Sequence, residues 1–140
     1  MASKKLLDLL NMAAAREIQV SIQYIWQHVM ARGFHSESIG NVFREIGITE
    51  MKHYEEIAER LDYLGGVPTV KPSEVKLSNS IRGMLEDDKA AEEEAIDLYK
   101  TIIQVAAEEK DVITKFLFEE ILKAEEGHHY KFRTLLEEDT

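Results

Sequence analysis

Three features are scarce in this chain of 140 residues. Cysteine is absent, which excludes disulfides, thiolate metal sites and a rubredoxin-like or zinc-ribbon module. Only 2 prolines and 7 glycines are present, so the secondary-structure elements should be long. No apolar run approaches the length of a membrane span, and the N-terminus has no apolar signal-peptide core.

The charge balance excludes one large class of partner. The formal net charge is −10 at pH 7, whereas a nucleic-acid binder must neutralise phosphates with Lys and Arg. An acidic surface can draw cations toward a site, although solubility alone would explain it. We therefore expect one cytoplasmic domain over residues 1–140, with no membrane and no nucleic-acid partner.

The apolar pattern predicts an all-α protein. Apolar residues recur three and four positions apart along four segments, which predicts helices at about 3–32, 36–64, 80–108 and 111–137. Both prolines, Pro68 and Pro72, fall between the second and third helices. This long connection lets the third helix start at the opposite end of the molecule. The predicted fold is an antiparallel four-helix bundle with one long crossover.

One pattern of polar residues occurs twice. Glu50 and His53 form a Glu-x-x-His, and a glutamate, Glu17, stands 33 positions before Glu50. The second copy is offset by 75 positions and consists of Glu92, Glu125 and His128, again with a lead of 33 positions. All six residues fall on the apolar stripes of their helices, where Leu or Ile would be expected. Four carboxylates and two imidazoles in matching halves are the ligand set of a di-metal centre in a four-helix bundle.

The spacing explains how these residues could share two ions. Residues three apart lie on one helix face, so each Glu-x-x-His can reach one point. Carboxylate oxygen and imidazole nitrogen suit iron or manganese. Glu50 and Glu125, on facing helices, are expected to bridge the ions, with Glu17 and Glu92 as terminal ligands. Without metal, several of these buried acids should take up protons.

Neighbouring residues have weaker functional interpretations. Tyr24 and Tyr99 each follow a leading glutamate by seven positions, which fits core packing, a hydrogen bond to a ligand carboxylate or electron donation. Asp88, one turn before Glu92, could support the ligands or mark an entry site. Glu126 and His129 form a further Glu-x-x-His one position out of register, and a solvated surface position is the simpler interpretation.

The residues quoted so far also carry a family resemblance. With Gln23-Tyr24 after Glu17, Glu50-Met51-Lys52-His53, the run from Leu64 to Pro68, and Glu125-Glu126-Gly127-His128, the chain resembles the bacterioferritins over nearly its whole length. The resemblance implies a ferritin-like fold and a ferroxidase that oxidises two Fe(II) per chain with dioxygen or peroxide, for iron storage or detoxification. The six metal ligands would be its catalytic residues.

The same resemblance implies a haem and an assembly. Bacterioferritins bind haem b between two subunits through a methionine, and Met51 matches that position; packing in a dimer interface without haem is the alternative. The family usually has a short fifth helix, and the sequence ends at Thr140 without one. We expect a homo-oligomer, a dimer at least, with cages of twelve or twenty-four subunits as alternatives.

Two other functions remain open from the sequence. The first is a rubrerythrin-like, peroxide-scavenging or manganese di-metal protein that stores no iron. The second is a non-catalytic helical interaction module whose polar core residues descend from a metal-binding ancestor. Bound metal in the purified protein would argue against the second, and a ferric core would argue against the first.

Overall fold

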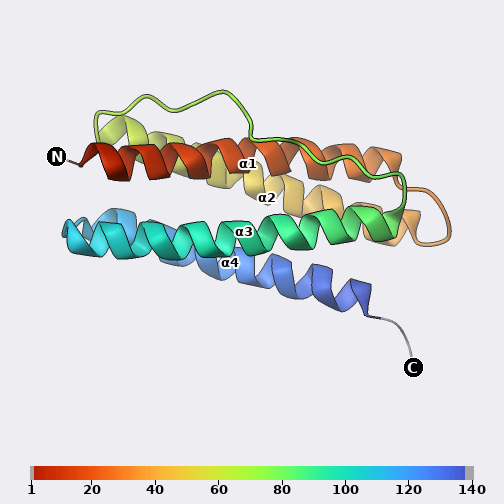
Figure 1. The fold of residues 1–140 in the computed structure, drawn as a ribbon. Coiled ribbons are helices and arrows are strands. Elements are labelled where there is room, and N and C mark those ends of the chain that lie inside the picture. The colour runs from red at the N-terminus through yellow and green to blue at the C-terminus, as the bar shows by residue number, and fades with distance from the viewer. Residues whose placement is uncertain (1, 138–140) are drawn as a thin grey trace.

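The computed structural model describes residues 2–137, which form four long α-helices. Their bounds are α1 Lys4–Met30, α2 Ser36–Tyr63, α3 Ile81–Glu108 and α4 Val112–Leu136. The helices form two antiparallel hairpins, α1–α2 and α3–α4, which lie against each other along their lengths (Figure 1). Within the described residues, no helix combines the length and the apolar composition of a membrane span.

Side-chain caps start three of the four helices. The hydroxyl of Ser3 accepts a hydrogen bond from the Leu6 amide, and Ser80 accepts one from the Gly83 amide, each at 3.0 Å. The carboxylate of Asp111 accepts from the Thr114 amide at 3.0 Å. Each cap satisfies an amide that has no partner inside its helix. Helix starts are therefore encoded locally.

The connection from residue 64 to residue 80 runs along the outside of the bundle from one end to the other (Figure 1). Asn11 on α1 holds it by donating to the Val67 carbonyl at 3.1 Å and accepting from the Thr69 amide at 2.9 Å. Further along, the Ser73 amide donates to the carbonyl of Ala15 at 3.0 Å. These bonds tie an irregular segment to α1, so that α3 begins beside the end of α1.

The apolar core consists of two clusters with a polar layer between them. On α1, the first cluster ends at Ala14 and the second begins at Val20. Burying a large apolar side chain contributes about 1.5–3 kcal/mol. The layer between the clusters contains charged side chains instead of apolar ones. Burial of these charges is costly in free energy unless other charges compensate them. The middle of the bundle is therefore where the fold departs from a simple hydrophobic core.

Candidate metal centre

Six polar side chains from all four helices meet in this middle layer. The four glutamates have no exposed surface, and His53 is 7% exposed. Their ligand atoms form two groups, each with all atoms within 4.8 Å of one another. Glu50 and Glu125 belong to both groups; the first also contains Glu17 and His53, and the second also contains Glu92 and His128. The six residues that the spacing selected are thus brought together.

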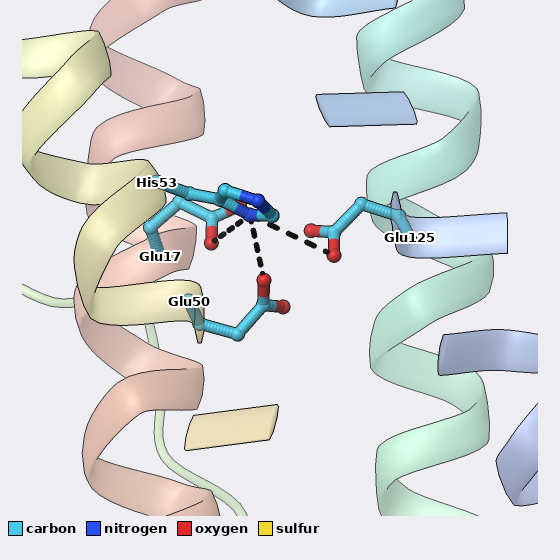
Figure 2. A group of neighbouring side chains, drawn as sticks. All are labelled: Glu17, Glu50, His53 and Glu125. Carbon is cyan, nitrogen blue, oxygen red and sulfur yellow. Dashed lines mark ion pairs between the residues drawn. The ribbon is translucent and has the colours of Figure 1, made fainter. Parts of the chain in front are cut away.

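Figure 2 shows the first group, in which His53 projects from α2 toward three carboxylates. The Nδ1 atom of His53 lies 2.9 Å from Glu50 Oε1, 3.7 Å from Glu17 Oε1 and 4.0 Å from Glu125 Oε1. Glu50 and His53 face the same point because they are one turn apart on a continuous helix. The imidazole therefore presents one nitrogen to three carboxylates from three helices.

The second group repeats this arrangement around His128 on α4. Its Nδ1 atom lies 2.9 Å from Glu125 Oε1, 3.6 Å from Glu92 Oε1 and 3.8 Å from Glu50 Oε1. The rings of His53 and His128 stack, with centroids 6.4 Å apart. The two halves of the centre are therefore related in structure as they are in sequence.

Two buried tyrosines hold the leading glutamates. The Tyr24 hydroxyl on α1 donates to Glu92 Oε1 on α3 at 3.0 Å, and the Tyr99 hydroxyl on α3 donates to Glu17 Oε2 on α1. Both tyrosines have no exposed surface. Each tyrosine thus orients the glutamate of the opposite repeat. Of the interpretations offered by the sequence, the hydrogen bond to a glutamate of the cluster is the one that the structure contains.

Arg16 is a residue of this centre that the sequence pattern did not indicate. Its Nη1 atom lies 2.7 Å from Glu50 and 3.1 Å from Glu17 and also contacts Glu125, while Nη2 lies 3.1 Å from Glu92. One signal was available, because Arg16 is the only Lys or Arg between Lys5 and Arg32. An isolated cation on the buried face of a helix indicates a buried anionic partner, because Arg is rarely buried unless it is paired.

The four carboxylates differ in acidity. Burial and the neighbouring carboxylates raise the pKa of Glu50 and of Glu125 well above the ordinary value. Burial also opposes ionisation of Glu17, but the Arg16 charge and two hydrogen-bonding neighbours lower its pKa to about 2. Despite burial, Arg16 and the facing histidine lower the pKa of Glu92. The two shared glutamates are therefore weaker acids than Glu17 and Glu92.

The histidines are more basic than usual. Burial lowers the pKa of His128, but its contacts with Glu125 and Glu92 outweigh burial and raise the pKa to about 9. The pKa of His53 is also raised, because contacts with Glu17 and other carboxylates outweigh burial. Without metal, the centre therefore carries protons at neutral pH.

Comparison with known proteins identifies the family to which this chain belongs. A family model described as a ferritin-like domain matches residues 7–140. The bacterioferritin of Desulfovibrio desulfuricans is 33% identical over 125 residues, which cover 89% of this chain and 70% of that protein. The chain belongs to the bacterioferritin family. The predicted family and the predicted ferritin-like four-helix fold are both confirmed.

Several solved structures have a fold closely similar to that of this bacterioferritin. A ferritin-like, di-iron-carboxylate protein from Bacillus anthracis matches with a TM-score of 0.94 at 27% identity, over 98% of this chain and 100% of that one. The Rhodobacter capsulatus bacterioferritin, described with a metal-free dinuclear site and a haem iron, has a TM-score of 0.88 at 28% identity. That match covers 96% of this chain and 85% of that one.

The donor set fits two metal ions. Four buried ligand atoms, Glu17 Oε1, Glu50 Oε1, His53 Nδ1 and Glu92 Oε2, have ion-pair contacts inside the cluster but form no hydrogen bond with the described residues. Buried polar atoms of this kind are rare in folded proteins unless an ion or water satisfies them. Oxygen and imidazole donors suit iron, manganese or zinc. The six residues can therefore hold two ions, one in each group.

Met51 lies away from this centre, on the outer face of α2. It is 55% exposed and borders a groove of about 340 Å³, whose other lining residues are Ile18, Ser21, Ile22, Tyr54 and Val70. The lining is predominantly apolar. The structure thus gives Met51 an open, apolar neighbourhood of the kind that a flat apolar ligand or a second subunit would cover.

The remaining sequence candidates lie outside the two groups. Asp88 is fully buried, and its Oδ1 atom accepts hydrogen bonds from the amides of Gln23 at 2.9 Å and Gln27 at 2.7 Å. His129 instead faces Glu93 near the surface, at 3.0 Å. Asp88 therefore supports the polar layer beside the centre, and His129 takes the surface position that the register indicated.

Proposed function

We propose that this protein is a di-iron ferroxidase of bacterioferritin type, which oxidises Fe(II) with dioxygen or peroxide for iron storage or detoxification. The observation that carries this proposal is the pair of buried groups that share Glu50 and Glu125. Two divalent ions would compensate four buried carboxylates, which no apolar environment tolerates as free charges. The solved relative from D. desulfuricans, described as having a di-iron site in different catalytic states, supports iron as the metal.

Each residue would have a defined role toward the iron. Glu50 and Glu125 would bridge the two ions, because each has an oxygen in both groups. Glu17 with His53 would complete one coordination sphere, and Glu92 with His128 the other. As substrate, each Fe(II) supplies one electron to the oxidant. The tyrosine hydroxyls would fix the two terminal glutamates, and hydrogen bonds of this kind typically change metal affinity 10- to 100-fold.

The surrounding protein controls protons and water. Binding of Fe(II) would displace protons from the centre, including the one held by His128, because metal ligands must be deprotonated. Phe118 and Ile121 on one side and Phe132 on the other are nearly or fully buried and exclude bulk water. Because apolar residues flank the centre, the protons released on iron binding would leave through the few polar groups that line it.

The test is the rate at which Fe(II) is oxidised in air. We expect about two Fe(II) per chain to be oxidised in a fast phase, and this phase to disappear in the double variant Glu50→Ala/His53→Ala. The control is Glu126→Ala/His129→Ala, which removes the out-of-register Glu-x-x-His of α4 and should keep the fast phase. Equal rates in the parent and the Glu50/His53 variant would show that the oxidation site lies elsewhere.

Haem binding and assembly belong to the same proposal. The haem iron described for the R. capsulatus relative and the apolar groove beside Met51 support haem b at a subunit interface, with Met51 as its ligand. Exposed apolar residues near this groove, Ile22, Ile25 and Val29, support a homodimer as the smallest assembly. A larger cage, a cytoplasmic location and the absence of a nucleic-acid partner stay predictions.

A further inference from the structure

Arg16 occupies the space between the carboxylates. One guanidinium nitrogen, Nη1, contacts the Oε2 atoms of Glu17, Glu50 and Glu125, at 3.1 Å from Glu17 and 2.7 Å from Glu50. The other, Nη2, lies 3.1 Å from Glu92 Oε2. Arg16 is 6% exposed. Within residues 2–137, no other Lys or Arg forms an ion pair with these four glutamates.

The contacts of Arg16 occupy carboxylate oxygens that Glu50 and Glu125 would need in order to bridge two metal ions. In both shared glutamates, Oε1 faces a histidine and Oε2 faces Arg16: Glu50 Oε1 lies 2.9 Å from His53, and Glu125 Oε1 lies 2.9 Å from His128. A carboxylate that bridges two ions with one oxygen on each uses both of its oxygens, so the guanidinium and the second ion would compete for Oε2. Two divalent ions would also leave Arg16 as a buried cation without a counter-charge, which is strongly unfavourable.

A place for the displaced side chain lies next to it. Arg16 lines a cleft of about 630 Å³ between α1, α3 and the crossover connection. Its walls carry Glu94, Asp8, which also pairs with Lys4 at 2.6 Å, and one other cation, Lys71. Apart from the glutamates, the guanidinium has one weak hydrogen bond, to the Ala91 carbonyl at 3.4 Å, and its Nε has no partner among the described residues. Little besides the carboxylates therefore holds the guanidinium inward.

We infer, building on the two-metal function proposed above, that Arg16 is an internal counter-ion that metal displaces. In the metal-free protein it holds the four carboxylates together. When two divalent ions bind, it moves outward into the cleft toward Asp8 and Glu94, where water also solvates it. Arg16 therefore raises the stability of the metal-free fold and lowers the affinity for metal, because its inward position must be given up first.

Removal of Arg16 should lower the stability of the metal-free fold but raise the affinity for metal. A residue with a merely structural role would change the stability alone. The test compares the parent with Arg16→Gln, using Mn(II) under anaerobic conditions as the divalent probe. If Arg16 lies inward nine-tenths of the time, its removal should tighten Mn(II) binding about tenfold. The same variant without metal should melt at a lower temperature than the parent. Arg60→Gln is the matched control, because Arg60 pairs with Asp111 at 2.8 Å, away from the centre; it should lower the melting temperature and leave Mn(II) affinity unchanged.

The outcomes separate this inference from the proposed function. Two Mn(II) per chain in both proteins, bound more tightly by Arg16→Gln, would support it. Two Mn(II) per chain in the parent, bound equally or less tightly by the variant, would overturn the role of Arg16 and leave the two-metal site standing. If neither the parent nor the variant binds Mn(II), the inference fails, and the rate of Fe(II) oxidation decides the proposed function separately.

A second measurement decides the case if Arg16→Gln does not fold. Crystals of the parent grown with and without Mn(II) report the position of Arg16 directly. With Mn(II), the guanidinium should lie in the cleft beside Asp8 or Glu94. A guanidinium still bound to Glu50 and Glu125 next to two Mn(II) ions would overturn the inference.

Discussion

At the scale of single residues, position within the centre determines chemistry more than residue type does. Four glutamates lie within one buried layer, yet Arg16 lowers the pKa of Glu17 and of Glu92, whereas burial and repulsion raise the pKa of Glu50 and Glu125. The acids with raised pKa values are the ones that both groups share. A carboxylate between two others is repelled most strongly, and it is also where two cations would be attracted most strongly.

The division into two groups predicts unequal effects of ligand loss. His53 belongs to one group and His128 to the other, whereas Glu50 belongs to both. We expect His53→Ala and His128→Ala each to retain one tightly bound Mn(II) per chain, and Glu50→Ala to retain none. Metal analysis after dialysis measures this directly, with His129→Ala as the control that keeps two. Loss of both ions from each single histidine variant would show that neither group can hold its ion without the other.

Metal binding should depend on pH with a defined sign. The pKa of His128 is about 9 in the folded, metal-free protein, so this residue is protonated at pH 7 and must lose a proton to bind metal. Between pH 6.5 and 8.5 we expect Mn(II) affinity to rise with pH, by up to about tenfold per unit for each displaced proton. Titration calorimetry at several pH values measures this, and a pH-independent affinity would show that no proton is displaced.

The stability of the metal-free fold should change in the opposite direction. The folded pKa of His128 lies above its ordinary value of 6.5, so protonation of this residue stabilises the fold fully below pH 6.5. This contribution is lost as the pH rises through about 9. Thermal unfolding in the presence of a chelator should therefore give a lower melting temperature at pH 9 than at pH 6.5, and the His128→Ala variant should show a smaller difference.

The six ligand candidates could be predicted from the sequence, whereas the isolation of Arg16 on its helix was only an indirect signal that did not reveal its contacts. Glu-x-x-His spacing and the apolar stripe are local properties of a helix, so Glu50 and His53 could be assigned to one inward face before their partners were known. Arg16 is the neighbour of Glu17, and adjacent helical residues point in different directions. It reaches the centre only because its long side chain bends inward, and that conformation depends on where the other three helices place their carboxylates.

At the scale of elements, the repeated pattern corresponds to repeated hairpins. Each hairpin contributes one leading glutamate and one Glu-x-x-His, and each tyrosine reaches across to the other hairpin. The two clusters of apolar residues lie on either side of this layer. The helices could be located from the sequence because their caps and stripes are local signals. The path of the connection could not, since its bonds to Asn11 and Ala15 join residues far apart in the chain.

The contact between Asp111 and Arg60 should contribute measurably to the free energy of unfolding of the bundle. Asp111 caps α4 and pairs with Arg60 of α2 at 2.8 Å, so it joins two helices at one end of the bundle. We expect Asp111→Ala to lower the free energy of unfolding by about 1–2 kcal/mol, measured by urea denaturation with chelator present. Asp97→Ala, at an exposed position of α3, should change it by less than about 0.5 kcal/mol. Equal losses in both variants would argue against this role for Asp111.

At the scale of the whole molecule, the centre and the groove beside Met51 are separate features. The centre is enclosed by all four helices, whereas the groove lies on the outside of α1 and α2 with residues of the crossover connection. A second subunit could therefore cover the groove without touching the metal ligands. Iron oxidation and haem binding should accordingly respond to different substitutions.

Haem binding offers a direct test of that separation. Protein produced with a haem precursor should show haem b absorption, and Met51→Leu should remove most of it while two metal ions per chain remain. Met12→Leu is the control, because Met12 is equally exposed, at 55%, but lies in α1 outside the groove. Haem absorption that survives Met51→Leu would show that another residue holds the haem.

Six residues from four helices are proposed to hold two iron ions. Crystals grown anaerobically with Fe(II), measured at the iron absorption edge, would test this most directly. Two anomalous peaks per chain are expected, one beside Glu17 and His53 and the other beside Glu92 and His128, with Glu50 and Glu125 in contact with both. Iron bound to the protein with one peak or none among these residues would contradict a two-iron centre.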